Sequence, residues 1–390
     1  MREKLSRKVL NIKPSGIRKF FDVANEIPDV ISLGVGEPDF DTPWHIREEG
    51  IRALKNGKTF YTSNSGLMEL RQEISNYTKR KTGISYDPAS EIFLTVGGSE
   101  AIDAAFRALL NPGDEVAYIE PSFVSYLPCV VMADGVPVPI ELKEENAFRL
   151  QREELEAVLT ERTKVLMISY PNNPTGAIME REDLEAIAEV VKEHDLLVLS
   201  DEIYSELTYK EPHVSIASLP DMKERTIVIN GFSKAFAMTG WRLGYAMGNA
   251  EIIEQMVKIH QYGIMSAPTV SQYAAIDALK NSEEDVRAMR DSYNQRRRFL
   301  MNFFRNVGLP CFEPYGAFYV FPNISEFGMS SEEFATELLR EEKVAIVPGD
   351  AFGACGEGYI RVSYAYSIEE LKRATKRLEH FILNLREKRK

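Results

Sequence analysis

Three charged residues stand in stretches of the sequence that are otherwise uncharged. Lys234 is the only charged residue in the range 226–241. A lysine in such surroundings loses hydration, which favours its neutral, nucleophilic form. Asp201 follows the run Leu196–Ser200, where a buried carboxylate needs a cationic partner or strong hydrogen-bond donors. Arg242 follows Lys234 by eight residues in the same weakly charged region. Together, these residues could supply a nucleophilic amine, a carboxylate and a guanidinium group to one site.

Each of the three has a structural alternative. Lys234 could be a snorkelling or ion-paired lysine, Asp201 a helix N-cap, and Arg242 half of an ion pair at the edge of the core. One ligand class would use all three charges: an aldehyde cofactor that carries a phosphate and a pyridine nitrogen. The lysine would form a Schiff base, the aspartate would pair with the protonated ring nitrogen, and the arginine would hold the phosphate.

A glycine turn offers a further anion site. Gly97-Gly98-Ser99 precedes a predicted helix, whose first backbone N–H groups and positive dipole end suit a phosphate. The chain contains no G-x-G-x-x-G fingerprint and no Walker loop, which disfavours a nicotinamide dehydrogenase or an ATP-binding enzyme. The five histidines show no metal-ligand spacing and are predicted to be structural, so no metal is expected.

The candidate residues follow short apolar runs that alternate with helical periodicity, a pattern typical of βα units and a mainly parallel sheet. The predicted strands are Ile92–Val96, Glu115–Glu120, Lys164–Tyr170, Leu196–Leu199, Thr226–Ile229 and Trp241–Met247. In open α/β sheets, ligands bind outside the carboxyl ends of the strands. We therefore expect Gly98-Ser99, Asp201 and Ser233-Lys234 to meet at one edge of the sheet.

The residue pattern changes near Lys280, where long predicted helices with many charged residues begin, such as Glu283–Asn306. The sequence predicts an α/β protein with two units: a large cofactor-binding domain over residues 41–282, and a smaller α+β domain formed by residues 1–40 and 283–390.

The amino-acid composition excludes several further classes of protein. The 390 residues carry 47 Lys and Arg against 59 Asp and Glu, a net charge of −12. This acidic balance disfavours a general nucleic-acid or anionic-membrane binder. Three cysteines are too few for a disulfide framework or a zinc site. Met1-Arg2-Glu3-Lys4 leads into more charge, and no apolar run approaches the ~20 residues of a membrane helix. We expect a cytoplasmic protein.

Several motifs together resemble the class I pyridoxal-phosphate (PLP) aminotransferases. They occur in the order found in that family, from about residue 30 to 366, and the similarity is greatest to the aspartate, aromatic and N-acetyl-diaminopimelate aminotransferases. The motifs are Gly34–Phe40, Pro171–Gly176, Ser200–Tyr204, Ser233–Arg242 and Gly358–Ala365. The resemblance implies the fold of that family, a seven-stranded mainly parallel sheet with a smaller α+β domain, and PLP as cofactor.

The resemblance also implies roles for individual residues. Lys234 would be the Schiff-base lysine and Asp201 the partner of the pyridine nitrogen. Tyr204 and Asn173 would bind the ring oxygen, and Arg242 the phosphate. The other implied cofactor contacts are Gly98, Ser99 and Glu100 at the phosphate, Phe123 stacked on the ring, Ser233, and Tyr61 reaching the phosphate of a neighbouring subunit. Gly36, Asn173 and Arg361 would bind the substrate, with Arg361 gripping its α-carboxylate. A role for Tyr61 across subunits implies a homodimer with shared active sites.

By this resemblance the reaction is ping-pong transamination from an amino acid, aromatic or aspartate-like, to a 2-oxo acid, with 2-oxoglutarate expected. Two alternatives stay open: an N-acetyl-LL-diaminopimelate aminotransferase, and a PLP lyase on the same fold. Aspartate-specific relatives often carry Lys where this chain has Ser99, and Phe123 replaces a commoner Trp. Both differences leave the amino donor undecided. The hydroxyl that the family often places three residues before the lysine is also missing, because Gly231 stands there.

Overall fold

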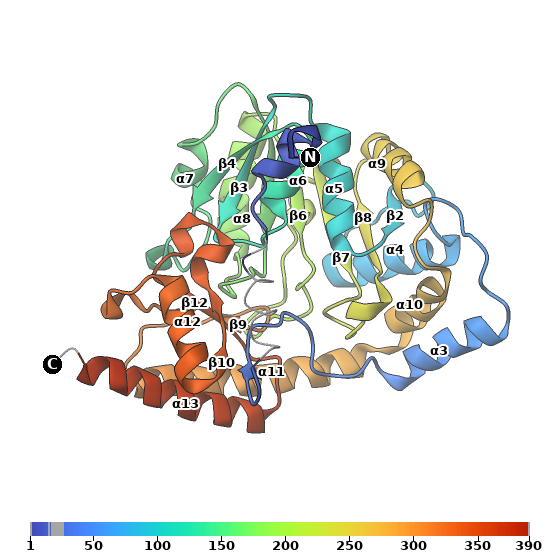
Figure 1. The fold of residues 1–390 in the computed structure, drawn as a ribbon. Coiled ribbons are helices and arrows are strands. Elements are labelled where there is room, and N and C mark those ends of the chain that lie inside the picture. The colour runs from blue at the N-terminus through green and yellow to red at the C-terminus, as the bar shows by residue number, and fades with distance from the viewer. Residues whose placement is uncertain (1, 15, 17–26, 389–390) are drawn as a thin grey trace.

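A seven-stranded sheet forms the centre of the molecule. The computed structural model describes residues 2–14, 16 and 27–388 (Figure 1). In the sheet order β2-β8-β7-β6-β5-β3-β4, the strand β8 runs antiparallel to both of its neighbours, and the other pairs are parallel. The strands are β2 (Ile92–Thr95), β3 (Glu115–Glu120), β4 (Val136–Glu141), β5 (Thr163–Ser169), β6 (Leu197–Asp201), β7 (Thr226–Gly231) and β8 (Gly244–Met247).

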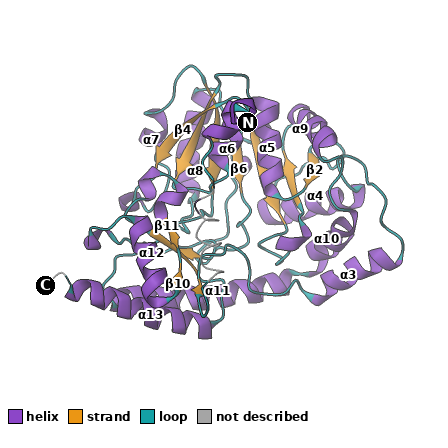
Figure 2. Cartoon of the chain, viewed as in Figure 1, coloured by secondary structure: helices purple, strands orange, loops and turns teal. Residues whose placement is uncertain are grey.

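Helices cover both faces of this sheet, as Figure 2 shows. Successive residues of a strand point to opposite faces, so Leu199 packs into one apolar layer and Val198 into another. The helices of the first layer are α5 (Gly98–Leu109), α6 (Tyr126–Met132) and α9 (Ala250–Gly263). Those on the opposite face are α4 (Met68–Thr82), α8 (Arg181–Glu193) and α10 (Thr269–Asn281), with the short α7 (Arg152–Glu156) beside α8. Because both faces of the sheet are buried, these strands consist of continuous apolar runs in the sequence.

The C-terminal third builds most of a second core. The long helix α11 (Glu283–Asn306) runs along the base of the molecule from α10 toward the C-terminal helices (Figure 1). Near it lie α12 (Ser331–Glu342), α13 (Ile368–Glu387) and an antiparallel sheet of β9 (Tyr319–Val320), β12 (Ile360–Ser363) and β11 (Val347–Pro348). The early strand β1 (Ile31–Ser32) pairs in parallel with β10 (Val344–Ala345). Residues near the start of the chain are thus joined to its C-terminal part.

Two further α-helices of the described residues lie in the N-terminal part of the chain. The helix α1 (Arg7–Asn11) precedes β1, and α3 (Trp44–Lys55) follows it, with α3 packed against α10. Of the N-terminal segment expected in the smaller unit, residues 1, 15 and 17–26 lie outside the described residues, as do 389–390 at the other end. Among the described residues, no helix is long and apolar enough to cross a membrane.

The predicted alternation of strands and helices is confirmed, with one omission. Each of the six predicted strands overlaps an observed strand, and β3 has the predicted bounds. The sequence did not predict β4, whose run Val136–Glu141 contains Pro137 and Pro139. These prolines are tolerated because β4 is an edge strand that pairs only with β3, so alternate backbone N–H positions face away from the sheet.

Candidate active site

A cavity of about 390 Å³ opens at the carboxyl ends of β5, β6 and β7. It is lined by nearly all the residues singled out from the sequence, and they come from distant parts of the chain. These lining residues include Gly36, Gly98, Ser99, Phe123, Asn173, Asp201, Tyr204, Ser233, Lys234, Arg242 and Arg361. The expectation that the chemically competent segments meet at one edge of the sheet is confirmed.

Lys234 lies in the loop after β7 and is half-buried. Its Nζ donates a 2.5 Å hydrogen bond to the carbonyl oxygen of Gly36, and it lies 5.9 Å from the ring centroid of Tyr204. Burial lowers the pKa of Lys234 to about 8; Glu37 opposes this shift, and the cationic Arg361 and Arg242 reinforce it. The amine is therefore far easier to deprotonate than an ordinary lysine.

Asp201 is the last residue of β6, and it is buried. The hydroxyl of Tyr126 donates a 2.8 Å hydrogen bond to its Oδ2, and the backbone N–H of Ile203 donates to its Oδ1 at 3.1 Å. Burial raises the pKa of Asp201 to about 6, against the effect of these two donors. No cationic side chain among the described residues forms an ion pair with it. Such a carboxylate suits a ligand that brings its own N–H donor.

Arg361 extends from β12 into the cavity and is 2% exposed. Its Nη1 donates to Asn173 Oδ1 at 2.8 Å, and its Nη2 donates to the carbonyl oxygen of Gly34. The guanidinium carbon lies 4.4 Å from the ring centroid of Tyr319. No carboxylate of the described part of the chain pairs with Arg361, and its Nε has no hydrogen-bond partner. A buried guanidinium without an acidic partner is suited to an anionic ligand.

Arg242 lies at the phosphate turn predicted from the sequence. Its Nη1 donates to the carbonyl oxygen of Thr239 at 2.9 Å. A Cβ added to Gly97, whose φ is +78°, would lie 2.7 Å from Arg242 Nη2. Gly97 thus allows the guanidinium to lie against the start of α5, where Gly98 and Ser99 present backbone N–H groups. A cation beside a helix N-terminus makes this end of the cavity a suitable phosphate site.

Two candidate residues do not line the cavity. The carboxylate of Glu100 points elsewhere: one oxygen accepts from the backbone N–H of Val96, and the other lies 2.5 Å from His260 Nδ1. Glu100 can therefore meet a ligand only through its backbone. Tyr61 is 81% exposed on the surface, away from the cavity of its own chain.

The sequence analysis did not single out Tyr126 or Tyr319. The Tyr126 hydroxyl binds Asp201, and the Tyr319 hydroxyl lies 2.8 Å from that of Tyr204. A Cβ at Gly36 would lie 2.5 Å from the Tyr319 oxygen, so this glycine is needed for the close approach. Tyr126 lies three residues after Phe123, at the start of α6, and this short separation in the sequence could have indicated it. Tyr319 stands in an apolar strand, and nothing in its local sequence marks it as part of the site.

The fold and this cavity match a known class of enzymes. A family model for aminotransferases of class I and II matches residues 28–378. The chain therefore belongs to the class I and II aminotransferases, and it is an enzyme that transfers an amino group from an amino acid to a 2-oxo acid. The family and enzyme class expected from the sequence motifs are confirmed.

Individual relatives support the same conclusion. An aspartate aminotransferase of Pyrococcus abyssi is 49% identical, over 97% of this chain and 97% of its own. Aromatic-amino-acid aminotransferase 2 of Thermococcus litoralis is 46% identical, over 96% of this chain and 97% of its own. The crystal structure of an aromatic aminotransferase from Pyrococcus horikoshii OT3 superposes with a TM-score of 0.90 at 47% identity, covering 94% of this chain and 99% of that one.

Proposed function

We propose that this aminotransferase uses PLP held in the cavity around Lys234, and that it transfers the amino group of an aromatic or aspartate-like amino acid to 2-oxoglutarate. One observation carries the proposal: Arg361, a buried arginine without an acidic partner among the described residues, faces the same cavity as a lysine with a lowered pKa and a buried aspartate that forms no ion pair with a described residue. This arrangement supplies separate sites for a carboxylate, an aldehyde carbon and a pyridine nitrogen.

The residues present fit this cofactor. Lys234 Nζ would bond to its aldehyde carbon, and Asp201 would accept the N–H of its protonated ring. Arg242, Ser233 and the backbone at Gly98, Ser99 and Glu100 would hold its phosphate, and Phe123 would stack on the ring. Tyr204 and Asn173 would donate to the ring oxygen. When bound, PLP supplies a carbonyl that takes up the amino group and a ring that withdraws electrons from the substrate Cα.

Lys234 then acts as the proton carrier. When its Nζ is free, it would accept a proton from the substrate Cα and hold it for return during the reaction. A pKa of about 8 leaves part of the amine neutral at neutral pH, so that it can act as a base. Asp201 would keep the ring nitrogen protonated, because an anionic carboxylate favours the charged form of its partner.

Arg361 determines which bond is broken. Its guanidinium would bind the substrate α-carboxylate with two parallel hydrogen bonds, beside the Asn173 amide that it contacts at 2.8 Å. A carboxylate fixed in this way leaves the Cα–H bond, and not the bond to the carboxylate, aligned for cleavage. This arrangement favours transamination over the decarboxylating lyase reaction.

The cavity favours an apolar side chain on the substrate. Its basic residues among those described are Lys234, Arg242 and Arg361, and each has a role in the proposal. The remaining lining includes Val35, Phe123 and other apolar side chains, so it gives a second carboxylate no additional cation within this chain. We therefore expect an aromatic donor to be preferred over aspartate.

A homodimer would complete the site. Phe60 and Tyr61 are each 81% exposed, and Tyr262 is 87% exposed. Aromatic residues this exposed are typical of subunit interfaces. In a dimer, Tyr61 could reach the phosphate bound by the second subunit.

The test is a panel of amino donors with 2-oxoglutarate, read as glutamate formed. The donors are phenylalanine, tyrosine, aspartate, alanine and N-acetyl-LL-diaminopimelate, and the visible absorbance of the purified protein is recorded in parallel. We expect visible absorbance from bound PLP and the fastest turnover with an aromatic donor. A colourless protein that PLP does not activate would refute the cofactor, and a clear preference for N-acetyl-LL-diaminopimelate would refute the substrate class.

A further inference from the structure

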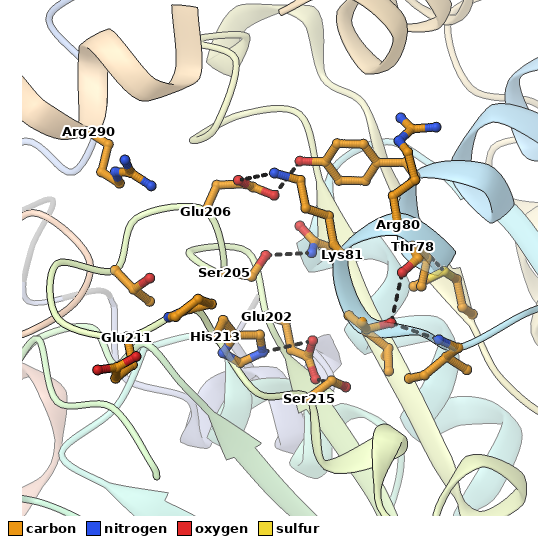
Figure 3. A pocket seen from close by; sticks show the side chains of 18 of the residues that line it. Thr78, Arg80, Lys81, Glu202, Ser205, Glu206, Glu211, His213, Ser215 and Arg290 are labelled. Atoms are coloured by element: carbon orange, nitrogen blue, oxygen red, sulfur yellow. Dashed lines mark hydrogen bonds and ion pairs between the residues drawn. The ribbon is translucent and has the colours of Figure 1, made fainter. Parts of the chain in front are cut away.

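A second cavity, of about 470 Å³, shares no lining residue with the cavity around Lys234. Figure 3 shows this second cavity from close by. Its lining comes from α4 and the residues just after it, from β7 and β8, from the segment 202–215 after β6, and from α11. The volume falls within the range of small-molecule sites, which is about 300–1,000 Å³. No residue of the proposed catalytic set lines it.

The two cavities share a thin wall, the segment that follows β6. Asp201, Ile203 and Tyr204 face the catalytic cavity, whereas Glu202 and Ser205 face the second one. Each side of this short stretch of chain therefore contacts a different cavity. A molecule in the second cavity would lie directly behind the residues that are proposed to hold the cofactor ring.

The charges around the second cavity are balanced. Its lining carries four basic residues and four acidic ones: Arg80, Lys81, Lys210 and Arg290, with Glu202, Glu206, Glu211 and Asp291. A simple anion would meet the four carboxylates, and a simple cation would meet the four basic groups. A molecule with both charges satisfies each set, so the electrostatics favour a zwitterion.

Several of these charges are already paired within the chain. Lys81 Nζ lies 3.1 Å from Glu206 Oε2, and the hydroxyl of Tyr77 donates to the same carboxylate. Lys210 pairs with Glu180 at 3.0 Å. At the floor, Glu202 accepts from Ser215 Oγ at 2.7 Å and lies 3.0 Å from His213 Nε2. Figure 3 shows the pair of Lys81 and Glu206 in the upper middle of the view, and Glu202 with His213 and Ser215 below it.

The lining charges with the fewest partners are Arg80, Arg290 and Glu211; Arg80 forms no ion pair with a described residue, but it donates to the carbonyl oxygen of Leu279 at 3.2 Å. The only ion-pair partner of Arg290 among the described residues is its chain neighbour Asp291, at 3.5 Å. Glu211 is exposed and forms no ion pair with any described residue. In Figure 3, Arg290 lies at the upper left and Glu211 at the lower left, and Glu206 and Lys81 lie to the right of Arg290. A carboxylate could bind Arg290 while an ammonium group binds Glu211.

The interior of the cavity is aromatic and has unused polar groups. Tyr77, Tyr86 and Tyr245 contribute rings to its lining. Tyr86 is 2% exposed, yet its hydroxyl has no hydrogen-bond partner. The Tyr245 hydroxyl also forms no hydrogen bond to any described residue. Aromatic rings prefer other rings as neighbours, and a buried hydroxyl without a partner is costly unless a ligand or water supplies one.

We propose that this second cavity binds a free aromatic amino acid as a zwitterion, with its carboxylate at Arg290, its ammonium group at Glu211 and its ring among the tyrosines. The site is separate from the cavity around Lys234 and is not a site of reaction, because it holds no residue of the catalytic set. The inference does not depend on the proposed function, since it uses no cofactor and no turnover.

Binding is tested by calorimetric titration with L-tryptophan as the probe. The protein is the Arg361→Ala variant, in which the catalytic cavity has lost the cation proposed to bind carboxylates. We expect one site per chain. Tryptamine lacks the carboxylate, 3-indolepropionate lacks the ammonium group, and L-alanine lacks the ring, so each should bind at least tenfold more weakly. Equal binding of 3-indolepropionate would refute a zwitterion site.

Variants locate the site. In the Arg361→Ala background, Arg290→Gln and Glu211→Gln should each weaken L-tryptophan binding about tenfold. The matched control is Arg287→Gln, because Arg287 is exposed on the same helix and does not line the cavity. Absence of binding, or binding that the Arg290 and Glu211 variants leave unchanged, would overturn the proposal.

A second measurement avoids the Arg361 substitution. Amide hydrogen exchange of the wild-type protein should slow in residues 77–86 and 205–215 when L-tryptophan is added. The same protection should persist in Arg287→Gln and disappear in Arg290→Gln. Protection that survives in Arg290→Gln would show that the probe acts from the catalytic cavity, and the proposal would fail even if transamination is confirmed.

Discussion

The hydroxyl of Tyr126 donates a 2.8 Å hydrogen bond to Oδ2 of Asp201, and both side chains are buried. Tyr126 lies at the start of α6 and Asp201 at the end of β6, so the contact joins two elements that the sequence separates by 75 residues. This hydrogen bond favours the ionised form of the carboxylate and opposes the effect of burial on its pKa. It makes Tyr126 a positioning residue for Asp201.

Tyr126→Phe should raise the pKa of Asp201 above about 6 and lower kcat roughly tenfold to a hundredfold at pH 6, because a hydrogen bond to a charged group is worth about 1.5–3 kcal/mol. The deficit should shrink as the pH rises, since a higher pH ionises the carboxylate again. The measurement is kcat against pH. Tyr118→Phe is the control, because the Tyr118 hydroxyl donates to Glu120 instead. A deficit that is constant with pH would argue for a purely structural role.

Asp201→Asn should change the pH dependence of stability in the cofactor-free protein. The pKa of Asp201 is raised from 3.8 to about 6 in the folded state, so its carboxyl group binds protons more tightly folded than unfolded. The wild-type protein should therefore lose stability relative to the variant as the pH rises from about 3 to about 7, by about 3 kcal/mol in all. Urea unfolding of both proteins across this range measures the difference. A difference that does not vary with pH would contradict the buried, protonatable state of Asp201.

Uptake of PLP by the cofactor-free protein should accelerate with pH around the pKa of Lys234. Only the neutral amine attacks an aldehyde, and burial lowers the pKa of Lys234 to about 8 from the ordinary 10.5. The rate of covalent attachment, followed by visible absorbance, should therefore level off above about pH 8. A rate that is still rising tenfold per pH unit at pH 9.5 would indicate an ordinary lysine, and the Lys234→Ala variant provides the background without attachment.

Gly97→Ala tests the phosphate end of the cavity. The added Cβ would lie 2.7 Å from Arg242 Nη2, so the guanidinium must move. We expect PLP to bind at least tenfold more weakly, as measured by equilibrium titration. Gly83→Ala is a control for a positive φ, +80° against +78°, with no atom within 4 Å of its added Cβ; its ψ is −7°, whereas the ψ of 167° at Gly97 lies in a region that essentially only glycine adopts. Both variants should lose about 1 kcal/mol or more of stability through backbone strain. Equal PLP affinity in the two variants would remove Arg242 from the phosphate site.

Arg361→Lys should separate substrate binding from cofactor binding. A lysine cannot reproduce the two parallel hydrogen bonds of a guanidinium, so KM should rise for both the amino donor and 2-oxoglutarate, each of which carries an α-carboxylate. We expect kcat to fall as well, because a misaligned carboxylate rotates the Cα–H bond out of line. The visible absorbance of bound PLP should be unchanged. An increase in KM for only one of the two substrates would make Arg361 a side-chain specificity residue instead.

Much of this protein could be predicted from local sequence. The alternation of apolar strands and amphipathic helices is a property of neighbouring residues, and it was sufficient to indicate the sheet and the order of its βα units. The same local reading identified Lys234, Asp201 and Arg242, because a charge inside an apolar run is conspicuous without any knowledge of its partners. Topology then implied that residues at strand ends meet.

Only the tertiary structure determined the contacts between distant residues. Arg361 reaches the carbonyl oxygen of Gly34, 327 positions away, and the Glu100 side chain turns to His260 and not into the cavity. The antiparallel direction of β8 and the edge position that lets β4 hold two prolines depend on the neighbours of each strand. Burial of Asp201 and Lys234, which shifts both pKa values, likewise results from packing across the whole chain. Residue types determine which chemistry is available, and long-range packing determines which groups are dehydrated and which meet.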